Sequence, residues 1–131
     1  MAFKIHSTDG GRVPSIEYLP VSAITTKAGM ALTQSSGKLA IAAGTTAPTY
    51  ISMEEAGAAH DSGDIIPVVR VQKDMIFETT LSTAGTSLNL GDKVTLHATN
   101  GMEVTATTSN GVVEIIDMDG TAVGSAVRVR F

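Results

Sequence analysis

The sequence contains no cysteine and no tryptophan, and only three phenylalanines and two tyrosines. Without cysteine, neither disulfides nor thiolate metal ligands can hold the fold. The core must therefore be built from Val, Ile, Leu, Ala and Met. Carbohydrate-binding modules use aromatic faces as sugar platforms, and this chain has almost none to offer. Stability has to come from packing and backbone pairing alone.

Positive charge is also scarce, with nine Lys and Arg against thirteen Asp and Glu, a formal net charge of −4. Nucleic-acid affinity depends mainly on clustered cations that neutralise phosphates, so we expect no nucleic-acid partner. No run approaches the roughly 20 apolar residues that span a bilayer, so we expect no membrane partner. The first ten residues lack the apolar core of a secretory signal, which predicts synthesis in a cytoplasm.

Motifs for catalysis and metal binding are missing. The histidines His6, His60 and His97 are far apart, and none has the spacing that puts two metal ligands on one face. A Gly-x-Ser-x-Gly elbow and glycine-rich phosphate loops are absent as well. We therefore expect no catalytic residues, no cofactor and no small-molecule substrate. A metal site assembled only in three dimensions stays open at this point.

Two acidic groups deserve comparison with calcium loops. Four carboxylates fall in one segment, namely Glu54, Glu55, Asp61 and Asp64. They lack the ligand spacing of a calcium loop, so we interpret them as solvated loop charges. Asp117, Asp119 and Gly120 give Asp-x-Asp-Gly, but the later Glu that completes such a loop is missing, and the pattern predicts a turn.

Short aliphatic and β-branched runs, separated by Gly and Pro, predict strands from residue 21 onward. The expected strands are Val21–Thr26, Met30–Gln34, Lys38–Ala42, Thr49–Met53, Ile65–Val71 and Met75–Leu81. Pro67 cannot donate to a ladder, which predicts an edge strand or a bulge. Ser52 and Glu55 have capping-box spacing, so one helical turn through residues 56–59 is an alternative. Gly57 and Gly63 favour an exposed loop there instead.

Three Asn-Gly or Asp-Gly pairs, about ten residues apart, predict hairpin turns and an antiparallel meander. The turns are expected at Asn100-Gly101, Asn110-Gly111 and Asp119-Gly120, and the strands at Lys93–Ala98, Glu103–Thr108, Val112–Met118 and Ala122–Phe131. The last strand alternates apolar and basic residues, which indicates one buried and one solvated face. The expected fold is all-β, a small antiparallel barrel or sandwich with little helix, in which residues 21–131 form one domain.

Residues 1–20 predict an extended arm. Pro14, Pro20 and the Gly10-Gly11 pair prevent a long helix, and a turn is expected at Asp9-Gly10-Gly11. Its spaced apolar residues favour packing of such an arm against another protein surface. It can dock on another chain, or it can add an edge strand to its own domain, and the sequence leaves both alternatives open.

The segment Ala28–Thr80 resembles the capsid decoration (cement, or head-stabilising) proteins of tailed bacteriophages. The resemblance lies in Ala-Gly-Met-Ala-Leu from Ala28, in Pro48–Met53, and in Ile65–Val71 leading into Met75–Thr80. It implies a β-tulip-like protein, often a homotrimer, that binds the outside of the expanded capsid. There it would clamp neighbouring subunits of the major capsid protein. The expected location is the capsid exterior of the virion, after assembly in the host cytoplasm.

In that family an N-terminal arm commonly reaches onto the capsid. The resemblance therefore implies capsid contacts by Phe3, Ile5 and Tyr18 as apolar anchors, and by Arg12 as a charge contact. Removing residues 1–14 is expected to leave the domain folded and to weaken attachment. The alternative is another phage structural component, a tail-tube or head-fibre protein, which would assemble into rings, polymers or fibres in isolation.

Overall fold

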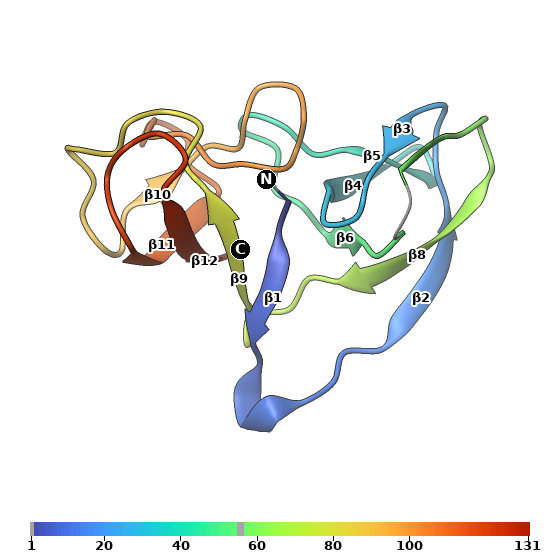
Figure 1. Cartoon of the computed structure of the whole chain (residues 1–131). Coiled ribbons are helices and arrows are strands. Elements are labelled where there is room, and N and C mark those ends of the chain that lie inside the picture. The colour runs from blue at the N-terminus through green and yellow to red at the C-terminus, as the bar shows by residue number, and fades with distance from the viewer. Residues whose placement is uncertain (1, 55–56) are drawn as a thin grey trace.

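The computed structural model describes residues 2–54 and 57–131, and almost all of their regular structure is β (Figure 1). One antiparallel sheet has the strand order β1 (Lys4–Ser7), β9 (Ile76–Thr80), β12 (Ala126–Arg130), β11 (Val113–Met118), β10 (Lys93–Val94). The other has the order β2 (Ile16–Pro20), β8 (Ile65–Arg70), β6 (Tyr50–Ser52), β4 (Ala31–Ser35), β5 (Lys38–Ile41). A third pair joins β3 (Thr25–Thr26) to β7 (Ala58–Ala59). The all-β prediction is confirmed.

The two five-stranded sheets share an apolar core. The first sheet contributes Phe77, Ile115, Val127 and Val129, and the second contributes Ala31, Ile51 and Val69. The second sheet also buries its opposite face, where Leu32, Tyr50, Ile66 and Val68 pack with Val21 and Met30. A sandwich therefore describes the arrangement, with one sheet covered on one face and the other on both.

The β4–β5 hairpin turns where the sequence predicts it. Ser36 and Gly37 both have positive φ, 52° and 80°, and Ser35 pairs with Lys38 across the two-residue turn. Positive φ at both central positions defines the turn type whose twist matches flanking strands. At the end of β2, Val21 bridges Leu39 of β5, so the two edges of the second sheet meet at that point.

The predicted meander is only partly correct. The segment 103–108 is not a regular strand, and β11 pairs with β10, where Lys93 lies opposite Glu114, instead of with this segment. The chain passes so close to β10 at Gly111 that a Cβ there would lie 2.2 Å from the Lys93 carbonyl oxygen. Residues 103–107 still hydrogen-bond to residues 95–97, for example from the Thr105 N–H to the Thr95 carbonyl at 2.9 Å, and Val104 bridges Leu81 and Leu96. The two-residue turn predicted at Asp119-Gly120 is also wrong, since β11 and β12 are joined by residues 119–125, with positive φ at Gly124.

The prediction that Pro67 marks an edge or a bulge is wrong, because β8 lies between β2 and β6. The Pro67 carbonyl accepts a hydrogen bond from the Met53 N–H at 2.9 Å. The N–H and C=O of one residue point to the same side of a strand, so the donor that proline lacks also faces β6. Since β6 ends at Ser52, only a terminal ladder bond is missing.

The segment from residue 2 to residue 20 contributes one strand to each sheet. Strand β1 is an edge strand of the first sheet and β2 an edge strand of the second, and a short 3-10 turn, η1 (Asp9–Gly11), lies between them. Figure 1 shows the chain descending along β1, turning, and rising along β2. The turn is where the sequence predicts it, with φ of 63° at Gly10. Of the two alternatives for the arm, the structure shows the second, in which the arm adds edge strands to its own domain.

Candidate protein-docking surface

Phe3, a predicted capsid anchor, belongs to the core of its own chain. Its side chain is 2% exposed, and its ring lies 5.1 Å from that of Phe131, centroid to centroid, in an edge-on arrangement. The Phe3 N–H also donates to the Gly29 carbonyl at 2.9 Å. The structure thus corrects the role of Phe3, because burial of so large an apolar group stabilises this fold and leaves nothing for a partner to contact.

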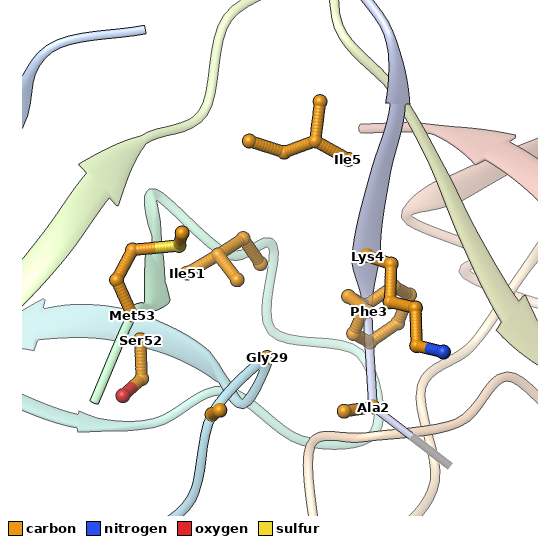
Figure 2. A pocket seen from close by; sticks show the side chains of 9 residues that line it. Ala2, Phe3, Lys4, Ile5, Gly29, Ile51, Ser52 and Met53 are labelled. Carbon is orange, nitrogen blue, oxygen red and sulfur yellow. The ribbon is translucent and has the colours of Figure 1, made fainter. Parts of the chain in front are cut away.

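Ile5 is half-buried and lines an apolar notch of about 360 Å³ between β1 and β6. Figure 2 shows Ile5 and Phe3 on the β1 side of the notch, with Ile51 and Met53 on the β6 side. Almost all of the lining is apolar, and the Ser52 hydroxyl accepts a hydrogen bond from the Glu54 N–H at 3.3 Å. The notch offers shape and apolar surface, and Lys4 and Ser52 are its polar side chains.

Arg12 is tied to its own chain. One guanidinium nitrogen lies 2.9 Å from the carboxylate of Asp74 and 3.1 Å from the side-chain oxygen of Gln72. The hydrogen bond from Arg12 holds the pKa of Asp74 below its ordinary value, because it stabilises the ionised carboxylate. Arg12 therefore fastens the η1 turn to the segment before β9. Arg12 is also 40% exposed, so its role as a charge contact with the capsid stays a prediction.

Tyr18 is the predicted contact residue whose side chain is available. It is 69% exposed on β2, and Ile16, two residues earlier on the same side of the strand, is 51% exposed. Ile65 at the start of β8 is 58% exposed, and Val13 just before β2 is 87% exposed. These four residues form what we call the β2–β8 apolar face.

Cross-strand register explains why this surface is apolar. Residues directly opposite in an antiparallel pair share one face, and here Ile16 lies opposite Val69, Tyr18 opposite Pro67 and Pro20 opposite Ile65. Val69 is buried in the core between the two sheets. The β2–β8 apolar face is thus the outer part of the second sheet's inner face. Figure 1 shows β2 and β8 along the margin opposite β10–β12, where the first sheet does not cover them.

Before its C-terminal end, where Val21 bridges Leu39, the backbone of β2 is open on its outer side. The Val21 N–H donates to the Asp64 carbonyl at 2.8 Å, so the backbone groups of Val21 face β8. Because the direction of these groups alternates along a strand, those of Leu19 and Glu17 face β8 as well. Ile16 and Tyr18 consequently direct their N–H and C=O groups outward. Among the described residues no strand pairs with them there. An edge with exposed apolar side chains and unpaired backbone groups is a template for another strand.

The acidic loop is organised around His60. Its Nε2 lies 2.8 Å from Glu54 and its Nδ1 lies 3.3 Å from Asp64, while Glu54 also accepts from the Thr26 hydroxyl at 2.9 Å. The carboxylates contact opposite nitrogens of one ring, so they cannot hold a single ion together with it. Asp61 donates its N–H to Asp64, and Glu55 lies outside the described residues.

Two carboxylates that both accept from one imidazole favour its protonated form. The hydrogen bond to Glu54 and then that to Asp64 raise the pKa of His60 above its ordinary 6.5, although burial works against them. A raised folded-state pKa adds stability that is fully present below pH 6.5 and is lost as the pH rises through the folded value.

We therefore expect the thermal unfolding midpoint to fall as the pH rises above about 6.5, and His60→Gln to flatten this part of the profile. NMR titration of the imidazole protons measures the His60 pKa directly. A His60 pKa at or below 6.5 contradicts the interpretation.

The two carboxylates of the Asp-x-Asp-Gly segment form ion pairs with an arginine of the same chain. Two contacts of 2.7 Å join Arg128 to Asp117 and Asp119, and a third of 3.2 Å joins it to Glu78. The hydrogen bond from Arg128 lowers the pKa of Asp119. These carboxylates balance a cation on the first sheet, and within residues 2–54 and 57–131 no group of three or more His, Asp or Glu side chains is placed to hold a metal.

No protein-family model and no curated protein matches this sequence. In the described part of the chain, no helix is long and apolar enough to cross a membrane. The resemblance to decoration proteins therefore stays a prediction.

Sequence reasoning identified Tyr18 but missed its neighbours Ile16, Val13 and Ile65. A signal was present, because Ile16 and Tyr18 alternate with Glu17 in the period of a half-buried strand. The alternation gives two faces, and it does not say which one the rest of the chain covers. Here Glu17 is on the side that packs against Ile66 and Val68, where it pairs with Arg70 at 3.2 Å.

Proposed function

We propose that this protein is a structural virion protein that binds the outer surface of an expanded phage capsid and stabilises it by clamping neighbouring major capsid subunits. The observation that carries the proposal is the β2–β8 apolar face beside the open edge of β2. Exposed apolar surface next to unpaired backbone supports docking of another protein. In this proposal Tyr18 and Ile16 make the contacts that the resemblance implied for an arm.

The mechanism needs no turnover. A protein that binds only the assembled lattice stabilises that lattice by mass action. A homotrimer, as the resemblance implies, would present three such faces, so the second and third contacts form at high effective concentration. Two packed sheets suit this role, because a rigid framework loses little conformational entropy on docking.

Co-sedimentation with undecorated expanded capsids of its own virus tests the proposal, together with electron microscopy of the pellet. We expect saturable binding and added density at the local threefold axes. The same preparation should stay a monomer or trimer without capsids. A folded protein that fails to bind, or that forms rings or fibres alone, would overturn the proposal and favour the tail-tube or head-fibre alternative.

A further inference from the structure

A hollow of about 230 Å³ lies on the first sheet beside the end of β12. It is lined by Lys73, Lys93, Val112, Glu114, Arg130 and Phe131. Lys93 lies directly opposite Glu114, and Glu114 directly opposite Arg130, so β10, β11 and β12 place these three side chains in one row. Lys73 comes from the turn before β9 and also borders the neighbouring hollow next to η1, which Arg130 shares.

The cations of this hollow differ from the other arginines of the protein. Arg12, Arg70 and Arg128 each have a carboxylate within 3.2 Å. Lys73, Lys93 and Arg130 have no ion pair with any residue that the structure describes. The Nε of Arg130 is buried and lacks a hydrogen-bond partner. Buried donors without an acceptor are rare in proteins, so this one points to an acceptor supplied from outside.

We infer that Lys73, Lys93 and Arg130 form a binding site for a compact dianionic oxyanion, phosphate or sulfate. The side chains that line the hollow sum to a charge of plus two, from three cations and the carboxylate of Glu114, which favours a dianionic ligand. The guanidinium fork of Arg130 can donate to two oxygens at once, and the lysines add point charges around it. Val112 and Phe131 exclude water from one side, which strengthens these attractions. The site does not depend on the proposed capsid role.

Glu114 allows a specific test of the proposed site, because its carboxylate competes with the ligand for the same cations. Neutralising it as Glu114→Gln removes that competition and retains the size of the side chain. Arg130→Gln removes the donor with the buried nitrogen. Lys4→Gln is the matched control, since Lys4 is an exposed cation that has no ion pair in the described structure and does not line this hollow.

NMR titration with inorganic phosphate, and separately with sulfate, tests the site at constant ionic strength, with chloride as the replaced ion. We expect saturable shifts at Lys93, Glu114 and the Arg130 Nε–H. Loss of one charge-assisted contact in Arg130→Gln should weaken binding about tenfold, Glu114→Gln should tighten it, and Lys4→Gln should leave it unchanged. Lys93→Gln, on a short edge strand, repeats the test if Arg130→Gln unfolds.

Shifts that grow linearly without saturation would overturn the inference. So would equal weakening in Arg130→Gln and Lys4→Gln, which would mean unspecific attraction to net charge. Tighter anion binding by the Glu114→Gln variant distinguishes a specific binding site from a purely structural role of Glu114 most clearly, because a structural role predicts no gain in affinity.

Discussion

Phe3→Ala is expected to destabilise the protein by about 3–5 kcal/mol, because it empties the space that a fully buried ring fills. The Phe3 ring packs against the Phe131 ring, whose centroid lies 5.3 Å from that of Phe77. The change therefore opens a cavity where β1 joins the rest of the first sheet. Domains of this size are stable by only about 5–15 kcal/mol. Urea unfolding followed by circular dichroism measures the loss.

Val13→Ala is the matched control, because Val13 lies in the same N-terminal segment and is 87% exposed. Its free energy of unfolding should stay within about 0.5 kcal/mol of the parent. Removal of residues 1–14 should destabilise the fold as well, since it deletes β1 and Phe3, which reverses the expectation from sequence. A loss of less than 1 kcal/mol for Phe3→Ala would mean that the N-terminal segment is not part of the core.

Ile16→Lys combined with Tyr18→Lys is expected to weaken capsid binding by about 100-fold or more and to leave the fold intact. Each change would place an unpaired charge in the centre of an apolar contact, and central anchor residues typically contribute about 2 kcal/mol or more each. In the free protein both side chains are at least half exposed, so their replacement removes little core packing. Co-sedimentation across a protein concentration series measures the affinity.

Val123→Lys is the control for added charge, because Val123 is 65% exposed in the loop between β11 and β12, outside the β2–β8 apolar face. It should bind capsids as the parent does. If both proteins bind equally well, or if both lose binding, the β2–β8 apolar face is not the docking surface.

Local patterns predicted most of the strands well. The Ser36-Gly37 turn, β6 after Pro48, and the alternation in β12 all follow from a few adjacent residues, and the structure confirms them. Where pairing is decided by distant segments, prediction failed. Residues 103–108 have the composition of a strand and hydrogen-bond to residues 95–97, but their pairing stays irregular, and β11 pairs with β10 instead of with them.

The N-terminal segment shows the same limit for the candidate site. Phe3 and Tyr18 have similar character in the sequence, yet Phe3 is 2% exposed and Tyr18 is 69% exposed. Spaced apolar residues in an extended segment satisfy either an internal sheet edge or a partner. Only the three-dimensional position of β1 against β9, and of β2 beyond the reach of the first sheet, separates the two roles.

Electron cryomicroscopy of decorated capsids tests the central claim most directly, because it shows which surface of this protein faces the shell. We predict that Ile16 and Tyr18 lie in the contact with the major capsid protein, with the outer edge of β2 paired or packed against a capsid segment. A bound protein whose β2–β8 apolar face points into solvent would contradict the account, even if decoration itself were observed.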